Sequence, residues 1–417
     1  MPANPLFTTD ESLFRRRPYV IYLTGRFFGT LANGSQSVLL AWDVYEIARR
    51  SMSVAEASFA VGMVGLVQFL PLVALTLVAG ETADRYSRKL ILVACYAAEL
   101  AIAVGLALAS SWSDKLAPLF ILSALFGAAR AFFQPSASAL GPMLVPLPLL
   151  SRAIATNSLA SQLASIIGPA LGGWLCSFSP AHGYAVCAGL YAAAATCALS
   201  IRVDTRPPVE PGRSRTAQIR EGLVYVWRNK LVFGAISLDL FAVLLGGATG
   251  LLPVFARDVL AVGPEGFGLL RASPAVGALL VAGFLAVRPI RSRAGKKMLI
   301  AVGLFGFMTV VFALSRSFPL SIFALAVLGG ADMVSVFTRQ SLVQISTPDR
   351  MRGRVSAVST LFIGASNELG EFESGVTARL FGPVGAVAFG GVGSLIVTGT
   401  WAWIFPDLRK ADRLHGH

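Results

Sequence analysis

The sequence is poor in charged side chains and in metal-binding side chains. Only 14% of its 417 residues are Asp, Glu, Lys or Arg, whereas about a quarter is usual in soluble globular proteins. The three histidines, His182, His415 and His417, lie outside the long apolar runs, and no glycine-rich phosphate-binding loop ending in lysine occurs. These shortages argue against a soluble protein, against a histidine-based metal site and against ATP as an energy source.

The sequence also lacks the residue patterns of a catalytic or metal centre. Its four cysteines all sit inside apolar stretches, without the spacing of a disulfide framework or a zinc site. They are Cys95, Cys176, Cys187 and Cys197. Because no nucleophile and base are paired and no ligand cluster is present, we predict that the chain is not an enzyme and holds no cofactor and no metal.

Apolar residues are what the sequence has in excess. They make up 55% of the chain, and the mean hydropathy is +0.68. A bilayer core about 30 Å thick needs about 20 consecutive apolar residues per helix, so this length has room for about twelve spans. Apolar runs between charges and turn formers predict transmembrane helices over 18–41, 54–79, 90–110, 117–142, 153–178, 183–201, 231–255, 266–287, 298–314, 318–343, 355–381 and 384–405.

The predicted helices fall into two sets of six, separated by the longest hydrophilic stretch in the chain. We therefore predict an N-terminal half over 1–201, a cytoplasmic linker over 202–230 and a C-terminal half over 231–417. Part of the linker has apolar residues at helical spacing, which predicts an amphipathic helix on the membrane surface that tethers the halves. These residues are Ile219, Leu223, Val224, Val226 and Trp227.

The net charge of +13 comes from basic residues between the apolar runs, not from one basic patch. With the N-terminus placed in the cytoplasm, most Lys and Arg residues fall on the cytoplasmic side, as the positive-inside rule requires. In this assignment Arg339 belongs to the cytoplasmic connections and Arg271 to those on the other side. We predict a multi-pass protein of the bacterial inner membrane with both termini cytoplasmic, and we expect no nucleic-acid partner.

The connection after the second predicted helix carries a motif that begins with a glycine and continues with an acidic residue and several basic residues. It contains Gly80, Asp84, Arg85, Arg88 and Lys89. This spacing resembles the signature loop of the major facilitator superfamily, although Glu81 stands where a hydrophobic residue is usual. The resemblance implies a conformational latch at this loop. The corresponding loop of the second half, 288–297, is basic but has no acidic residue.

Other runs of the sequence extend the resemblance. Residues 168–173 look like the end of the superfamily's antiporter motif, with ordinary packing of small residues as the alternative. Residues 127–135 and 347–355 together resemble the enterobactin-exporter branch of the superfamily. The resemblance covers nearly the whole chain and implies an all-α membrane protein with the major facilitator fold, twelve transmembrane helices in two six-helix halves.

Acidic residues inside the predicted spans are the candidate proton sites, because a charge at the bilayer centre costs about 2.5 to 3.5 kcal/mol on insertion scales. We predict proton coupling at Glu368, Glu371, Asp332 and Asp239. Glu368 and Glu371 are three residues apart on one helix face, so the two carboxylates should not both ionise easily. Glu373, two residues further along, points elsewhere. The alternative is that these acids pair with Arg339, Arg379 or each other and fix helix packing.

Polar residues of the first half are the candidate substrate contacts. Arg26 and Arg130 are expected to bind an anionic group or to act as counter-ions to the acids, with packing ion pairs as the alternative. Asn33, Gln36 and Gln134 are their neutral companions. Glu99 also lies inside a predicted span, and the sequence suggests no partner for it.

These features together predict a secondary active transporter. The leading prediction is export of a small organic molecule, a siderophore or an amphiphilic drug, by proton antiport and alternating access. An importer of a lipid or sugar-type solute and a divalent-cation exporter that uses Asp332, Glu368 and Glu371 as ligands are the alternatives. The expected partners are the solute, protons and the lipid bilayer, and the protein is expected to be a monomer.

Overall fold

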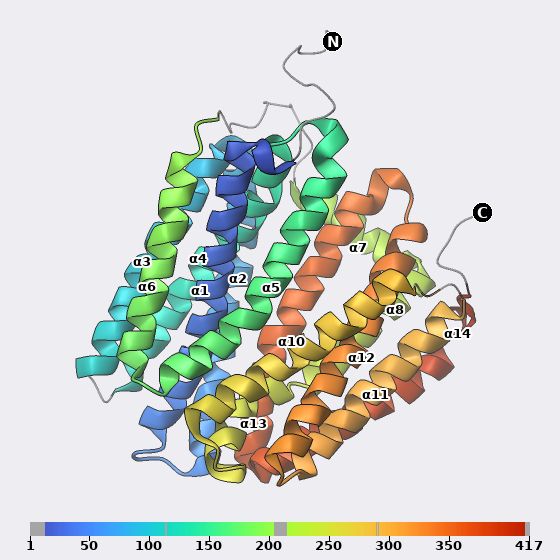
Figure 1. Ribbon diagram of the computed structural model, residues 1–417. Coiled ribbons are helices and arrows are strands. Elements are labelled where there is room, and N and C mark those ends of the chain that lie inside the picture. Colours follow the sequence, from blue (N-terminus) through green and yellow to red (C-terminus); the bar gives the residue numbers. More distant parts are fainter. Residues whose placement is uncertain (1–12, 113–114, 204–214, 289, 291, 413–417) are drawn as a thin grey trace. The chain divides into compact units, whose positions relative to one another are not determined.

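The computed structural model describes residues 13–112, 115–203, 215–288, 290 and 292–412, and these residues form helices and connections without any β-strand (Figure 1). The first six long helices are α1 (Arg17–Ala48), α2 (Val54–Arg85), α3 (Arg88–Trp112), α4 (Leu116–Met143), α5 (Leu150–Cys176) and α6 (Pro180–Ser200). After the linker helix α7 (Arg215–Arg228) come α8 (Lys230–Leu245), α10 (Gly263–Val287), α11 (Ala294–Leu314), α12 (Phe318–Ile345) and α13 (Asp349–Ile404). The short elements are η1 (Leu13–Arg15), η2 (Leu147–Leu149), η3 (Ala248–Leu251), α9 (Leu252–Val254), the π-helical turn η4 (Phe255–Val259) and α14 (Pro406–Lys410).

These helices confirm the predicted all-α membrane architecture. Among the described residues, 10 helical stretches are long and apolar enough to cross a membrane. One of them covers both the eleventh and the twelfth predicted helices, since α13 runs through Gly382, where φ is 73°, into Pro383. A positive φ followed by proline breaks the helical course, so α13 accounts for two spans. With the 32-residue α1, which is less apolar, twelve spans are accommodated.

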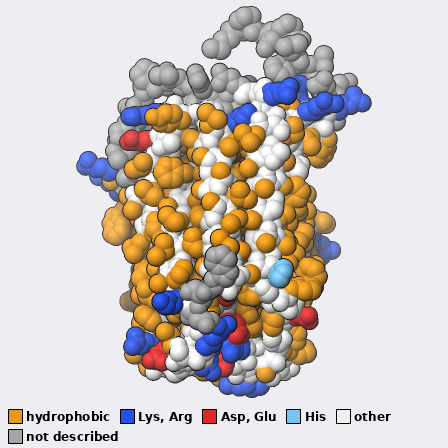
Figure 2. Space-filling view, turned by 90° about the vertical axis from the view of Figure 1, so that its left-hand side faces the viewer, with side chains coloured by type: hydrophobic (Ala, Val, Ile, Leu, Met, Phe, Trp, Pro, Cys, Tyr) orange, Lys and Arg blue, Asp and Glu red, His pale blue; other side chains and the backbone are white. Residues whose placement is uncertain are grey.

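The outer surface fits a lipid environment. Figure 2 shows hydrophobic side chains over the middle of the visible face, with Lys, Arg, Asp and Glu gathered mainly near its two ends. Large apolar side chains on several helices are more than half exposed, among them Leu280 and Ile300. In water such exposure would be costly, whereas lipid tails accept it.

The seventh predicted span, 231–255, is confirmed as part of a membrane-crossing stretch over Lys230–Val259, but it is not one unbroken helix. Helix α8 ends at Leu245, and Gly246 and Gly247 precede the separate elements η3 and α9. Glycine is required here because a Cβ atom on Gly247 would lie 2.5 Å from the carbonyl oxygen of Gly370. The Ser374 hydroxyl donates a hydrogen bond to the Gly247 carbonyl oxygen at 3.1 Å, which satisfies an acceptor that the broken helix leaves open.

The chain divides into two compact units. The first contains Met1–Leu40 and Leu70–Gly212, and the second contains Ala41–Phe69 and Arg213–His417. In the first unit, the Tyr19 and Tyr22 hydroxyls donate to the carbonyl oxygens of Ala153 and Ala137, both at 2.7 Å, and so tie α1 to α5 and α4. The predicted division at 202–230 stays a prediction.

The second unit includes the end of α1 and the beginning of α2, which pack on the later helices through small and aromatic residues. A Cβ atom on Gly62 would lie 2.6 Å from the Cα atom of Gly375, so α2 and α13 touch backbone to backbone. The Trp42 and Phe267 rings stack with their centroids 5.4 Å apart. Residues 41–69 are therefore held in the second unit by close contacts with α10 and α13.

The basic loop 288–297 receives from the C-terminus the acid that its own sequence lacks. Arg293 has a left-handed backbone with φ 53°, and its N–H donates to a carboxylate oxygen of Asp412 at 2.7 Å. The next residues, Ala294 and Gly295, donate to the carbonyl oxygens of Asp412 and Ala411. Asp412 thus caps the N-terminus of α11, where negative charge is favourable.

Candidate functional site

A buried ion pair joins α8 to α12 in the second unit. The Arg339 guanidinium lies 3.1 Å from a carboxylate oxygen of Asp239, and the two side chains are only 2% and 7% exposed. Arg339 was assigned to a cytoplasmic connection from the sequence, and this is wrong, because it lies within α12 and faces the interior. Its burial is possible because Asp239 neutralises it in place of water.

A second carboxylate, Asp332, adjoins this pair. Asp332 lies within electrostatic range of both Asp239 and Arg339 and is partly exposed. Together with Asp239, Ser335 and apolar residues it lines a cavity of about 10 Å³, which is about the space that one water molecule needs. The buried Ser335 hydroxyl has no hydrogen-bond partner among the described residues. The group therefore holds two carboxylates against one guanidinium.

The predicted pair Glu368 and Glu371 lies on the face of α13 that meets α2. A Cβ atom on Gly65 would be 2.8 Å from the Glu368 carbonyl oxygen and 3.0 Å from the Glu371 Cβ atom. Glu371 forms an ion pair with Arg271 at 3.5 Å, and Arg271 also donates to the Thr249 carbonyl oxygen at 2.9 Å. Proton coupling at Glu368 and Glu371 remains a prediction.

Two other expectations concern this region. Arg271 was assigned to a connection between helices, and this is wrong, because it lies within α10. Glu373 was expected to point away from Glu368 and Glu371, and its carboxylate accepts a hydrogen bond from Thr377 at 2.6 Å. Arg379, a possible partner of the acids, lies 5.1 Å from the centre of the Phe59 ring.

The predicted substrate contacts of the first half lie on α1 and α4. Arg26 donates to the Tyr22 hydroxyl at 2.9 Å, within the hydrogen-bond chain that reaches α4. Gln36 is fully buried, and its amide has no hydrogen-bond partner among the described residues. Asn33 is partly exposed and Gln134 is exposed. Their role in substrate binding stays a prediction.

The structure gives Glu99 the partner that the sequence did not suggest. Glu99 is 2% exposed on α3 and lies within electrostatic range of Arg130 on α4. Tyr96, about one helical turn before Glu99 on α3, lies within electrostatic range of both Glu99 and Arg26. The connection between α3 and α4 is short, which makes the two helices neighbours. That proximity could have suggested Arg130 as the partner of Glu99 from the sequence. This pairing favours the alternative of a packing ion pair for Arg130.

The signature loop binds its own unit through its basic residues. Arg88 donates to the Ala139 carbonyl oxygen near the end of α4 at 3.3 Å, and Lys89 donates to the Ile201 carbonyl oxygen after α6 at 2.6 Å. Both contacts place a cation at the C-terminal end of a helix, where the helix dipole favours it. Gly80 and Arg85 were expected in the connection, but they lie within α2, which ends at Arg85 and not at residue 79. Gly80 is buried and Arg85 is exposed, whereas the Asp84 side chain lies outside the described part of the chain.

A further polar cluster, which sequence reasoning missed, joins the end of α1 to η4. We call it the outer clasp: Tyr45, Glu46, Arg49, Arg257 and Asp258. The Tyr45 hydroxyl donates to Asp258, Arg49 lies 3.2 Å from Asp258, and Arg257 lies 3.0 Å from Glu46. The hydrogen bond to Asp258 raises the pKa of Arg49 above its ordinary value, so its charge persists at physiological pH. The π-helical turn that aims Arg257 and Asp258 has no signature in the sequence.

The outer clasp predicts a charge-swap result. Glu46→Arg places two cations together and should weaken the clasp, whereas Glu46→Arg with Arg257→Glu restores an ion pair. Because both side chains are about a third exposed, their attraction is worth no more than about 1 kcal/mol. We expect the single variant to lower the transport rate severalfold and the double variant to recover most of it, as measured by initial rates in proteoliposomes. Equal rates in both variants would contradict this role.

The comparisons with known proteins agree with the fold. The family model described as Major Facilitator Superfamily matches residues 22–370. The enterobactin exporter EntS of Escherichia coli O81 (strain ED1a) is 25% identical over 345 residues, which cover 80% of each chain.

Solved transporters share the architecture. A bacterial homolog of the human lysosomal transporter Spinster, solved in an inward-facing and unoccupied conformation, matches with a TM-score of 0.72 at 16% identity and covers 94% of this chain and 96% of its own. A D-xylose-proton symporter matches with a TM-score of 0.72 at 13% identity, with 94% and 98% covered. At these identities the likeness shows the fold alone.

Proposed function

Because the chain belongs to the major facilitator superfamily, we propose that it exports a small organic molecule across the bacterial inner membrane in exchange for protons. Both termini are proposed to be cytoplasmic, since the basic connections then obey the positive-inside rule. The export direction and the organic cargo are supported by the relatives named as enterobactin exporters. A siderophore or an amphiphilic drug is the proposed class of cargo.

The observation that carries the proton coupling is the group formed by Asp239, Asp332 and Arg339. Two ionised carboxylates beside one guanidinium leave one uncompensated negative charge within a membrane helix pair, which is costly. One proton removes this charge without any other partner. Asp332 is the proposed carrier of that proton, because Asp239 is engaged in the ion pair and Asp332 is partly exposed.

Proton uptake and release at Asp332 then change the balance of charge around Arg339 in the second unit. With Asp332 protonated, Arg339 has a single anionic partner, and the Asp239 pair is complete. When Asp332 loses its proton, Arg339 is attracted by both carboxylates, and α8 and α12 experience a different force at their contact. A solute that binds one conformation better than the other couples to this proton, since linkage between two ligands is reciprocal.

The two ends of α2 supply the proposed conformational contacts. The helix runs for 32 residues from Val54 to Arg85, about 48 Å at 1.5 Å per residue, which is enough to cross the bilayer. The outer clasp lies near its beginning and the signature loop at its end. We propose that contacts at these two ends hold alternative states, with the Asp84 loop stabilising the outward-open state.

The first unit supplies the proposed solute contacts. Arg26, Gln36 and Asn33 follow one another along α1, and the Gln36 amide has donor and acceptor capacity that no described residue uses. An oxygen-rich organic solute matches such groups. Burial of an amide without a partner is unfavourable, so a ligand that reaches it would gain binding free energy.

Transport into inside-out vesicles tests this function. With the interior made acidic, we expect the protein to accumulate a catecholate siderophore or an amphiphilic cation, and to lose this accumulation when an ionophore collapses the pH gradient. A sugar and a divalent cation serve as alternative substrates in the same assay. Accumulation of either of these, and not of the organic candidates, would contradict the proposed cargo. Accumulation that survives the ionophore would contradict proton coupling.

A further inference from the structure

The linker helix α7 is firmly docked on the second unit along one side. Val226 is 3% exposed and packs with Val232 and Val355 in a buried apolar cluster. A Cβ atom on Gly222 would lie 2.8 Å from the Arg354 carbonyl oxygen, and the Tyr225 hydroxyl donates to the Ser346 carbonyl oxygen at 2.7 Å. The helix is therefore a packed part of this unit and not only a tether.

The opposite side of α7 exposes apolar side chains. Trp227 is 76% exposed, and Leu223 and Val224 are more than two fifths exposed. Arg220 and Arg228 are exposed on the same short helix. Apolar residues mixed with basic ones on one face are typical of a helix that lies at the boundary between lipid headgroups and acyl chains, so the bilayer surface is what this face meets.

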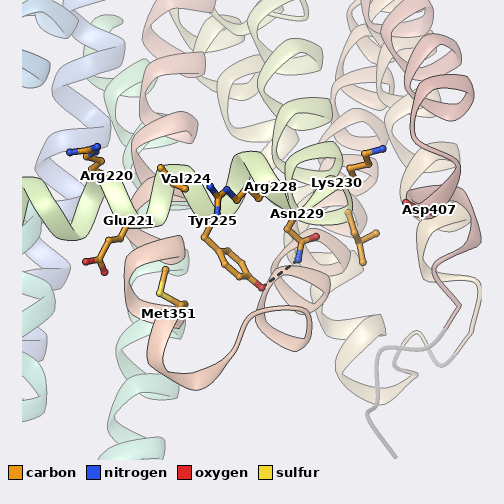
Figure 3. Close-up of a pocket in the computed structure, with 10 residues that line it drawn as sticks. Arg220, Glu221, Val224, Tyr225, Arg228, Asn229, Lys230, Met351 and Asp407 are labelled. Carbon is orange, nitrogen blue, oxygen red and sulfur yellow. Dashed lines mark hydrogen bonds between the residues drawn. The ribbon is translucent and has the colours of Figure 1, made fainter.

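A cavity of about 1160 Å³ adjoins α7 (Figure 3). Its charged lining residues are Arg220, Arg228, Lys230, Glu221 and Asp407. Figure 3 shows Glu221 and Tyr225 on one side of α7 and Arg220 and Lys230 on the other.

The charges of this cavity favour an anion. Glu221 forms an ion pair with Arg354, so one of the two lining carboxylates is already neutralised. Within the described residues, no carboxylate forms an ion pair with Arg220, Arg228 or Lys230. The cavity therefore keeps an excess of positive charge next to an apolar, membrane-facing helix side.

We propose that this cavity binds the headgroup of an anionic phospholipid, with its phosphate held by Arg228 and Lys230 and its acyl chains lying along Leu223 and Trp227. The planar guanidinium of Arg228 matches a phosphate with two parallel hydrogen bonds. A lipid fits better than a soluble anion, because the exposed indole and leucine side chains gain nothing from a free phosphate. The neighbouring Asn229 caps α8 by accepting from the Val232 N–H at 3.2 Å, so a bound headgroup also holds the junction of α7 with α8.

Native mass spectrometry of the full-length protein in detergent tests this site with phosphatidylglycerol as the probe. Each basic residue near an anionic membrane surface contributes about 1 kcal/mol, which is about fivefold in affinity. We expect Arg228→Gln with Lys230→Gln to weaken phosphatidylglycerol binding about 25-fold. Arg409→Gln, which removes an exposed charge of α14 outside the cavity lining, is the matched control and should leave binding unchanged.

Further measurements distinguish lipid binding from the binding of other anions. They also distinguish loss of the site from misfolding of a variant. Phosphatidylcholine and inorganic phosphate should each bind far more weakly than phosphatidylglycerol, and Trp227→Gln should weaken the lipid but not the phosphate. Arg228→Lys with Lys230→Arg keeps the charge and should retain lipid binding. Unchanged phosphatidylglycerol binding in the double Gln variant, equal binding of phosphatidylcholine, or competition by inorganic phosphate at comparable concentrations would each overturn the proposal. Should the double Gln variant fail to fold, loss of wild-type lipid binding at high salt supports the site, and salt-independent binding overturns it.

Discussion

Asp332→Asn is expected to abolish solute accumulation driven by a pH gradient. A gradient of one pH unit stores about 1.4 kcal/mol per proton, which sustains about tenfold accumulation when one proton exchanges for one solute. An amide cannot carry a proton and release it, so the variant should let the solute reach only equal concentrations on both sides. Downhill exchange of solute should continue, because Asp332 is proposed to bind the proton and not the solute. Vesicle uptake with and without the gradient separates the two effects.

Glu373→Gln is the matched control for this experiment. Glu373 is an acid within a long helix, like Asp332, but its carboxylate is bound to Thr377 of its own helix. We expect it to accumulate solute as the wild type does. If Asp332→Asn also accumulates solute to the wild-type level, the proton site lies elsewhere, and Glu368 or Glu371 becomes the leading candidate.

Arg339→Leu is expected to be the most destabilising single substitution in the second unit. It leaves Asp239 as a buried carboxylate without its cation, and loss of one partner of a buried ion pair costs about 3 to 5 kcal/mol. Arg339 is 2% exposed, so bulk water does not reach the carboxylate that is left behind. We expect a large fall in the unfolding midpoint in detergent and poor recovery of folded protein.

The partner variant distinguishes lost pairing from lost packing. Combining Arg339→Leu with Asp239→Asn removes both charges, so most of the lost stability should return. Replacement of a buried ion pair by uncharged residues is often close to neutral. Equal instability of the single and double variants would mean that the shape of Arg339, and not its charge, holds α8 against α12.

The architecture was readable from the sequence because bilayer thickness fixes the length of an apolar run. Glycine followed by proline at 382–383 marks the boundary between the last two spans, and Trp227 and Val226 mark the amphipathic linker helix. The break after α8 was not readable, since Gly246 and Gly247 look like any small pair in an apolar run. Only their close approach to Phe305 and Gly370 shows why a helix ends there.

The candidate site was only partly readable, because charge partners depend on which helices meet. The acids Asp239, Asp332 and Glu371 were identified from their apolar flanks alone. The sequence offered Arg339 only as a possible partner of Glu368 and Glu371. It did not indicate the ion pairs of Arg339 with Asp239 and of Arg271 with Glu371, because both arginines lie near helix ends in the sequence. The Asp412 cap on α11 was also out of reach, since 119 residues separate it from Arg293.

Proton movement driven by solute tests the central claim most directly. Proteoliposomes that contain a pH-sensitive dye are given a solute gradient and no initial pH gradient. We predict that solute flow in the wild type drives protons the opposite way, and that Asp332→Asn carries the solute without any change in internal pH. Solute flow without proton movement in the wild type, or undiminished proton movement in Asp332→Asn, would contradict a proton site formed by Asp239, Asp332 and Arg339.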